Sequence, residues 1–419
     1  MTLKQMILKL QDSNYKYTFL GVGPVSKNVI KATFLSCKKY DCPPLFIASR
    51  NQVDLKELGY GYLMGGMDQS LFSNLILEMK EEVGYTGQVY ICRDHGGPWQ
   101  RNIELDEKYP IDKAMDIARK SFRADIEAGF NYLHIDPTKC PHDFTQDDLI
   151  DWTVELLEYC EQQRISLSKP EIDYEIGTED IQGGLTSNQT FESFLRKIVQ
   201  KLEERKLPMP TCIVGQTGTL CKIDKNCGSF DKNQTAQLVD IAKKYGVGLK
   251  EHNGDYMGVA SIRVHNDIGV SGMNVAPEFG LVETDAYLYL AKLEEKLLND
   301  KWIALQDYSG LQDLFLEKTF YQSPWKKWMT SDIKNLSEQE VRDDHFLRLL
   351  IARVCGHYVY DLPEVKTAIR KLLKNINSFK VIEADAGEFV IGRIRDAIEL
   401  YLENFNLNGI NLRCLTPIG

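Results

Sequence analysis

The sequence predicts an α/β fold, namely a (β/α)8 TIM barrel followed by a C-terminal helical extension. Over about the first 290 residues, short apolar runs alternate with longer stretches of helical periodicity. The short runs number eight, which favours a closed barrel over an open sheet. Beyond residue 285, helical stretches follow one another with little strand pattern. We therefore expect a barrel over residues 1–285 and a helical extension over residues 286–419.

The expected strands end in glycine, proline, asparagine or aspartate, as the buried strands of a parallel sheet do. They cover residues 17–22, 45–49, 89–92, 132–136, 171–176, 211–214, 247–251 and 268–275. Stretches with apolar residues three and four apart separate them, and these predict helices at residues 70–82, 111–128, 147–163, 191–204 and 235–245. In the extension we expect helices at residues 284–299, 343–354, 363–375 and 387–402. The extension either packs on the barrel or forms an oligomerisation element.

Composition and motifs exclude several classes of protein. The net charge of −10 argues against non-specific binding of nucleic acid, which requires a basic face. No run approaches the roughly 20 apolar residues of a membrane span, and the first residues lack a signal-peptide pattern, so we expect a cytoplasmic protein. No G-x-G-x-x-G or P-loop motif follows an early strand, which counts against a Rossmann fold and an ATP-dependent kinase.

Polar side chains gather at the carboxyl ends of the expected strands, where barrel enzymes place their chemistry. His95, Glu175 and His252 together offer two imidazoles and a carboxylate, a set that suits zinc, manganese or cobalt. Asp94, beside His95, is well placed as a general acid or base. Each residue alone is also typical of a hydrogen-bonded structural position. Their occurrence at the same end of successive strands favours a metal site. The other polar residues at these ends are Arg50, Asn51, Gln52, His134, Asp136, Glu179, Gln216, Lys250, Asp255 and Asn274.

Several motifs resemble the class II tagatose-bisphosphate aldolase Z-subunit family, which is related to class II fructose-bisphosphate aldolases. They are Arg50-Asn51-Gln52-Val53, Asp94-His95-Gly96-Gly97-Pro98-Trp99, His134-Ile135-Asp136, Ile176-Gly177-Thr178-Glu179, His252-Asn253-Gly254-Asp255-Tyr256 and Pro324-Trp325-Lys326-Lys327-Trp328. The resemblance implies a (β/α)8 barrel, a divalent metal and a cytoplasmic role in carbohydrate metabolism. Some members of the family are accessory subunits of a partner aldolase, and some relatives are metal-dependent sugar C4-epimerases.

The resemblance also implies roles for individual residues. Asp94 matches the catalytic acid of the aldolases, with Glu179, Asp136 or Asp255 as a second acid or base. His95, Glu175 and His252 match metal-associated positions, and Gln216 stands nearest to an aldolase histidine that this sequence lacks. We expect the substrate-binding residues to be Arg50, Asn51, Gln52, His134, Lys250 and Asn274.

Three hypotheses for function follow. The first is a metal-dependent aldolase or C4-epimerase that acts on a ketose or a ketose phosphate. The second is a non-catalytic subunit that stabilises or activates a partner aldolase, and either protein could form a homo-oligomer. The third is Schiff-base chemistry at Lys250, which would require burial to lower the pKa of this lysine. A free sugar, a sugar phosphate and a uronate all remain open as substrates.

Overall fold

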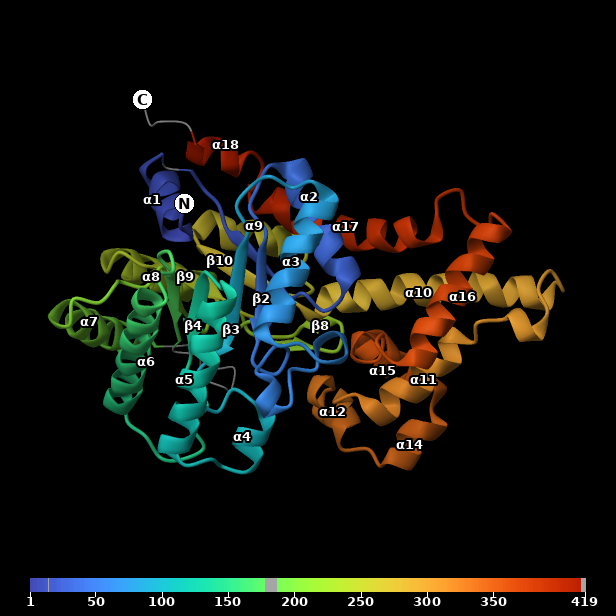
Figure 1. Ribbon diagram of the computed structural model, residues 1–419, viewed down its shortest axis with the longest axis horizontal. Helices are drawn as coiled ribbons and strands as arrows, with labels where there is room; N and C mark the ends of the chain where they lie inside the picture. The colour runs from blue at the N-terminus through green and yellow to red at the C-terminus, as the bar shows by residue number, and fades with distance from the viewer. Residues whose placement is uncertain (14, 178–186, 416–419) are drawn as a thin grey trace.

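Parallel strands close into a barrel in the computed structural model, which describes residues 1–13, 15–177 and 187–415 (Figure 1). Neighbouring strands pair in the order β1-β10-β9-β6-β5-β4-β3-β2, and Phe19 of β1 pairs with Gly272 of β10 to close the sheet. The predicted (β/α)8 fold is therefore confirmed. The strands are β1 (Phe19–Val22), β2 (Leu45–Ser49), β3 (Tyr90–Gly96), β4 (Tyr132–Ile135), β5 (Asp173–Ile176), β6 (Cys212–Val214), β9 (Gly248–Glu251) and β10 (Gly272–Val275).

Helices cover the outside of the barrel, and two of the longer ones were not predicted. Ser26 begins the first, α2, because its hydroxyl accepts a hydrogen bond from the Val29 backbone N–H at 3.1 Å. The second, α9, ends at Gly269 with φ of 90°, so β10 begins at Gly272 and the strand start predicted at residue 268 is wrong. The helices are α2 (Lys27–Tyr40), η1 (Lys56–Leu58), η2 (Leu63–Gly65), α3 (Gln69–Val83), α4 (Asn102–Asp106), α5 (Ile111–Ala128), α6 (Gln146–Ser166), α7 (Asn188–Glu204), α8 (Lys232–Lys244) and α9 (Val259–Ile268).

The two ends of the chain meet at the amino-terminal end of the barrel, where α1 (Leu3–Asp12) lies near α18 (Ile410–Leu415) (Figure 1). Thr2 and Gln5 form a capping box at the start of α1. The Leu3 backbone N–H donates to the buried Asp173 carboxylate at 2.6 Å, and Lys9 Nζ donates to the Cys414 carbonyl at 2.8 Å. This end is therefore covered, which leaves the opposite end for a site.

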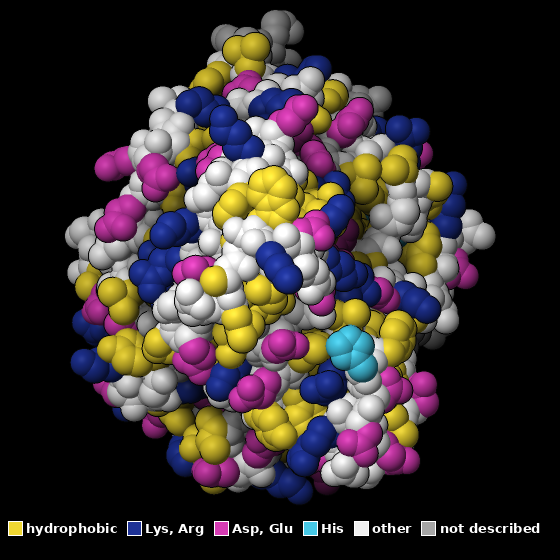
Figure 2. Space-filling view, turned by 90° about the vertical axis from the view of Figure 1, so that its right-hand side faces the viewer, with side chains coloured by type: hydrophobic (Ala, Val, Ile, Leu, Met, Phe, Trp, Pro, Cys, Tyr) yellow, Lys and Arg dark blue, Asp and Glu magenta, His cyan; other side chains and the backbone are white. Residues whose placement is uncertain are grey.

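The helical extension is continuous with the barrel through α10 (Pro277–Asn299), so the predicted boundary at residue 285 falls inside one helix. The last long helix, α17, returns to pack against α2 and α10 (Figure 1). On the face of the extension shown in Figure 2, hydrophobic side chains lie in separate patches among acidic and basic ones. Its elements are η3 (Leu305–Asp307), α11 (Leu311–Gln322), α12 (Trp325–Trp328), α13 (Ser331–Lys334), α14 (Glu338–Asp343), α15 (His345–Cys355), η4 (Gly356–Tyr358), α16 (Pro363–Ser378) and α17 (Ala386–Asn404). None of the described helices is long and apolar enough to cross a bilayer.

A fully buried ion pair supports the strand that carries Asp94 and His95. Arg93 donates from Nε to Asp125 on α5 at 2.9 Å, and from Nη1 to the carbonyls of Ala48 and Val53, each at 2.9 Å. Removing one partner of such a pair leaves a buried charge without compensation. Arg93→Ala is therefore expected to lower the free energy of unfolding by about 3–5 kcal/mol, measured by urea denaturation. Arg123→Ala, which removes an exposed ion pair with Glu127 on α5, should change it little.

Candidate active site

The end of β3 turns two consecutive side chains toward the centre of the barrel. In a regular strand, neighbouring side chains point to opposite faces, so Asp94 and His95 could not share a site. The pairing of β3 with β4 shifts register between Arg93 and Gly96, and His95 adopts a φ of 44°. Such a bulge re-aims a side chain, and its positive φ is a strained backbone geometry of the kind found at functional sites.

Three histidines from three strands converge at this end of the barrel. His95 from β3, His134 from β4 and His252, directly after β9, have ring centroids 4.7 to 5.3 Å apart. Each ring offers one nitrogen, and these nitrogens all lie within 4.8 Å of one another. His134, which was predicted to bind substrate, thus joins the two histidines that were predicted to bind metal.

Asp136 holds the ring of His95. The Nδ1 atom of His95 lies 2.7 Å from Asp136 Oδ2, while Thr138 donates to Asp136 Oδ1 from its backbone N–H and its hydroxyl. Burial alone would raise the pKa of Asp136, but the hydrogen bond from His95 and the nearby positive groups keep it far below its usual range. An ionised Asp136 leaves the proton on Nδ1 of His95 and the lone pair on Nε2, which is the arrangement found in metal-ligating histidines.

Glu175 joins His252 to a buried lysine. Its Oε1 atom lies 2.9 Å from His252 Nε2, and its Oε2 atom accepts from Lys250 Nζ at 2.5 Å. Although burial opposes ionisation of both partners, their mutual attraction lowers the pKa of Glu175 well below its usual range and raises that of Lys250. Lys250 is therefore a charged ammonium group, which opposes the Schiff-base hypothesis because an amine must be neutral to attack a carbonyl.

Asp94 lies against this cluster and is oriented by Asn274 at the end of β10. Asn274 Nδ2 donates to Asp94 Oδ1 at 2.9 Å, and the same oxygen lies 3.8 Å from His252 Nε2. Burial would raise the pKa of Asp94, but His95, His252 and Lys250 together lower it, so the carboxyl group is ionised. Its side chain keeps 14% of its surface exposed, so a ligand can reach it.

The chemistry of the three imidazoles fits a divalent cation. Burial lowers the pKa of His134 to about 4, so this ring is neutral, as a ligand must be. Its Nδ1 atom accepts a hydrogen bond from the His95 backbone N–H at 3.2 Å, so the ring's proton is on Nε2, and a cation bound at Nε2 would replace that proton. The Nε2 atom is buried and has no hydrogen-bond partner among residues 1–13, 15–177 and 187–415. Gly177 keeps this side open, since a Cβ atom there would lie 3.0 Å from His134 Nε2. Asp136 supplies the kind of outer carboxylate that metal-binding histidines use, and Glu175 contacts His252.

Three residues predicted to bind substrate make hydrogen bonds within the wall of the barrel. Arg50 is fully buried, and its guanidinium group binds Asp54, Glu104 and the Gly97 carbonyl, while its contact with substrate stays a prediction. A buried guanidinium must be paired, and the two carboxylates meet that need. Asn51 bonds to the Gln100 carbonyl and the Asn102 N–H, and Gln52 accepts from the Ser49 N–H.

Asp255 lies at the start of α10 rather than among the three histidines. Its Oδ1 atom accepts from the backbone N–H groups of Ala276 and Glu278, at 2.8 and 2.9 Å, and so caps this helix. Burial and the charge of Glu278 raise the pKa of Asp255 to about 7. Gln216 is buried just after β6. Glu179 falls outside the described residues.

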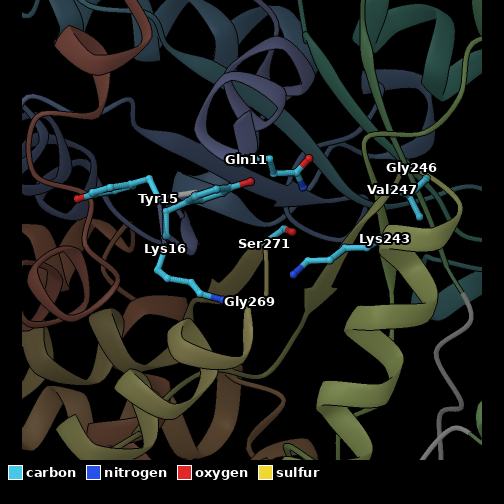
Figure 3. A pocket seen from close by; sticks show the side chains of 9 residues that line it. Gln11, Tyr15, Lys16, Lys243, Gly246, Val247, Gly269 and Ser271 are labelled. Carbon is cyan, nitrogen blue, oxygen red and sulfur yellow. The ribbon is translucent and has the colours of Figure 1, made fainter. Parts of the chain in front are cut away.

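A separate hollow of about 350 Å³ lies at the opposite, amino-terminal end of the barrel (Figure 3). Lys16, Lys243 and Ser271 line it, and Ser271 directly precedes β10. Lys243 is in the last turn of α8, and its Nζ atom lies near Gly269, the residue that ends α9. Its positive charge therefore stabilises the free carbonyl groups at the carboxyl ends of both helices. This hollow and the three histidines lie at opposite ends of the barrel strands, so the hollow is not part of the candidate site.

Comparison with known proteins agrees with this geometry. Two curated relatives are D-tagatose-1,6-bisphosphate aldolase subunits GatZ, one from Salmonella choleraesuis and one from Salmonella enteritidis. The first is 24% identical over 376 residues, covering 84% of this chain and 82% of the relative, and the second is 24% identical over 360 residues, covering 80% and 78%.

Two solved structures share the fold. A probable tagatose 6 phosphate kinase from Sinorhizobium meliloti 1021 has a TM-score of 0.74 at 17% identity, covering 92% of this chain and all of that one. The fructuronate-tagaturonate epimerase UxaE from Cohnella laeviribosi has a TM-score of 0.57 at 12% identity, covering 93% and 81%. The family model for D-tagatose-1,6-bisphosphate aldolase subunits of the GatZ/KbaZ-like type matches residues 3–389, so the chain belongs to this family.

Proposed function

We propose that this protein is a divalent-metal-dependent enzyme that acts on a ketose or a ketose phosphate by aldol cleavage or C4 epimerisation. One observation carries the proposal. His95, His134 and His252 each offer one ring nitrogen, these three nitrogens all lie within 4.8 Å of one another, and the ionised Asp94 lies beside them. Membership of the tagatose-bisphosphate aldolase subunit family supports the same class of substrate.

His95, His134 and His252 would hold the cation, and zinc suits their nitrogen atoms best, with manganese or cobalt as alternatives. Glu175 is a candidate for a further ligand because its Oε1 atom already touches His252. Gln216, just after β6, remains the residue predicted to stand where the aldolases have a metal-binding histidine. When bound, such a cation polarises a ketose carbonyl and stabilises the negative charge that develops on its oxygen.

Asp94 would move the proton. Its carboxylate accepts the proton of the C4 hydroxyl as the C3–C4 bond breaks, and the electron pair of that bond moves to C3, next to the carbonyl. C4 leaves as the carbon of an aldehyde, and in net cleavage the proton held by Asp94 is delivered to C3 so that the other product leaves as a ketone. If the aldehyde turns over and the bond re-forms, Asp94 returns the proton and the C4 configuration is inverted. Asn274 keeps Asp94 Oδ1 in place for both steps.

The Asp136–His95 contact gives a prediction for metal affinity. Asp136→Asn removes the negative charge that orients and polarises the His95 ring, so the affinity for zinc should fall about 10–100-fold. Isothermal titration calorimetry of the metal-free protein with zinc measures this. Asp143→Asn, an exposed change in the same loop, is the matched control and should leave the affinity unchanged. Equal zinc affinity in Asp136→Asn and the wild type would contradict the assignment of His95 as a ligand.

The proposed reaction is tested with a panel of ketoses and ketose phosphates, each incubated with the metal-free protein and with zinc, manganese or cobalt added. Nuclear magnetic resonance distinguishes a C4 epimer from the triose products of cleavage. We expect one of these products, formed only when metal is present. If the metal-loaded protein converts none of the substrates, the proposed activity is wrong.

A second candidate function is that of a subunit supporting a partner aldolase, which the description of the family favours. This candidate predicts no turnover by the chain alone and a higher activity or melting temperature of a co-expressed class II aldolase. The same panel, repeated with and without that aldolase, separates the two functions. An Asp94→Asn chain that supports the partner as well as the wild type would favour the subunit role.

A further inference from the structure

The loop that follows His252, residues 252–258, joins β9 to α9 and has an unusual backbone. Asn253 and Tyr256 in this loop have positive φ angles of 58° and 62°. A bulky side chain such as that of tyrosine rarely adopts this left-handed region, and such a conformation persists only where the surrounding structure imposes it. The candidate metal ligand His252 is therefore attached to a segment whose shape depends on contacts from other parts of the chain.

A short hairpin contacts the carbonyl groups of this loop. The hairpin consists of β7 (Cys221–Lys222) and β8 (Lys225–Asn226). Thr219, just before the hairpin, donates from Oγ1 to the His252 carbonyl at 2.8 Å. Asn226 donates from Nδ2 to the carbonyls of Asn253 and Asp255, at 2.9 and 3.2 Å. The hairpin therefore holds the loop from within the barrel region of the chain.

Tyr401, near the end of α17 in the helical extension, contacts the second half of the same loop. This side chain is fully buried. Its hydroxyl oxygen lies 3.0 Å from the Gly254 carbonyl oxygen, and the Met257 backbone N–H donates to it at 3.5 Å. One hydroxyl group therefore contacts both ends of the turn at residues 254–257, which includes the strained Tyr256.

Glu278, in the first turn of α10, joins Tyr401 to Tyr256. Its Oε2 atom accepts from the Tyr401 hydroxyl and from the Tyr256 backbone N–H, each at 2.6 Å. Because a phenol carries one proton, Tyr401 donates to Glu278 or to Gly254 at any one time, and Glu278 is the nearer acceptor. The backbone N–H of the strained residue is thus held by a carboxylate that Tyr401 orients.

The position of Tyr401 is itself fixed by hydrogen bonds at the end of α17. Asn404, three residues further along the helix, accepts from Arg263 Nε on α9 at 2.7 Å. The carbonyl of Phe405, directly after the helix, accepts from the Thr18 backbone N–H at 3.2 Å, just before β1. This part of α17 is therefore fastened to the barrel, and it presents the Tyr401 hydroxyl to the loop at a fixed place.

We propose that Tyr401 is a positioning residue of the metal site, because its hydroxyl group keeps the loop of residues 252–258 in the strained conformation that presents the His252 imidazole to the cation. The last long helix of the extension thereby helps to set the affinity for metal. This inference rests on the proposed function and adds to it a residue that acts through the backbone. Tyr401 lies beyond residues 3–389, which the family model matches, so membership of the family assigns it no role.

The strained loop depends on its contacts most before a cation binds. Without the Tyr401 hydroxyl, Asn253 and Tyr256 can return to ordinary backbone angles, and His252 then leaves its place among the imidazoles in a fraction of the molecules. Zinc binds the molecules that keep the loop in place, so the apparent affinity falls in proportion to that population. We expect about one molecule in ten to keep it in Tyr401→Phe, which removes one oxygen atom and retains the ring.

Isothermal titration calorimetry of the metal-free full chain with zinc tests this inference. Tyr401→Phe should bind zinc about tenfold more weakly than the wild type. Glu278→Ala should also weaken binding, and Tyr401→Phe should add little in that background because both residues act on the same turn. Tyr287→Phe is the matched control. It removes another buried tyrosine hydroxyl, which accepts from Asn28 Nδ2 on α2 at 2.9 Å, and it should leave the affinity for zinc unchanged.

Hydrogen exchange followed by mass spectrometry separates positioning from a purely structural role. In Tyr401→Phe, the amides of residues 253–257 should exchange faster than in the wild type when zinc is absent, and at the wild-type rate when zinc is saturating. A purely structural role predicts faster exchange throughout α17 in both conditions, a lower melting temperature and an unchanged affinity for zinc.

The inference is overturned if Tyr401→Phe binds zinc as tightly as the wild type, if Tyr287→Phe loses as much affinity, or if the wild type binds no zinc. Unchanged exchange over residues 253–257 would overturn it as well. Zinc binding that depends on Tyr401 supports the inference even if no ketose is converted, so its failure and the failure of the proposed reaction are distinguishable.

Discussion

His252→Ala is expected to lower the affinity for zinc by more than about 100-fold and to abolish metal-dependent turnover. The change removes one of three imidazoles and leaves Glu175 beside a cavity, still paired with Lys250. Replacing a residue that only hydrogen-bonds to a metal ligand lowers the metal affinity about 10–100-fold, so loss of a ligand itself should lower the affinity further. Zinc content after dialysis against a competing chelator measures the effect.

The matched control for this prediction is His345→Ala, because His345 is exposed at the start of α15, in the helical extension. It should keep the zinc content and the activity of the wild type. If His252→Ala retained one equivalent of zinc as firmly as His345→Ala, the three histidines would not be the metal site. Circular dichroism of both variants would exclude unfolding as the cause of a loss.

Asp94→Asn is expected to lower kcat by about 10²–10⁴-fold while the zinc content stays unchanged. The amide has nearly the same shape as the carboxylate, but it cannot accept a proton at neutral pH. Because Asp94 Oδ1 accepts from Asn274 and lies 3.8 Å from His252 Nε2, which is beyond hydrogen-bonding distance, its replacement should leave the three rings in place. Steady-state kinetics on the metal-loaded protein, with zinc measured in the same samples, checks both parts.

Asp112→Asn, an exposed change in the first turn of α5, serves as the control for loss of one negative charge. It should leave kcat unchanged. A loss of zinc in Asp94→Asn that matched its loss of activity would show that Asp94 acts through the metal. Wild-type kcat in this variant would remove Asp94 from the chemistry altogether.

The barrel could be predicted from the sequence because its strands are short segments rich in apolar residues that alternate with helical stretches, a pattern typical of strands buried on both faces. Of the helices that were not predicted, α2 and α9 carry signals that can be identified. The signal for α2 was the serine cap at Ser26, which was not used, and α9 carries His265 and Asn266 on its buried side. Glycine at position 269 marks the end of α9, and giving it weight would have corrected the start of β10.

The candidate site was partly predictable, since strand ends in a barrel converge whatever the loops do. That rule pointed to His95 and His252, and it placed His134 and Asp136 among the polar residues at the same strand ends. It could not show that Asp94 and His95 both turn inward, because this depends on a bulge and a positive φ at His95. Nor could it show that His134 lies against the other two rings.

Arg50 shows why a polar residue at a strand end is not always part of a site. Like Asp94 it stands at the carboxyl end of a barrel strand, yet its partners are Asp54 in the following loop and Glu104 on α4. The pairing with Glu104 links residues 54 positions apart, which no local pattern reveals.

The central claim is that His95, His134 and His252 hold a divalent cation next to Asp94. The most direct measurement is anomalous X-ray scattering, recorded on either side of the zinc absorption edge from crystals grown with zinc. The account predicts one strong anomalous peak within bonding distance of all three imidazoles. A map with no peak there, or with zinc bound only at other residues, would contradict it.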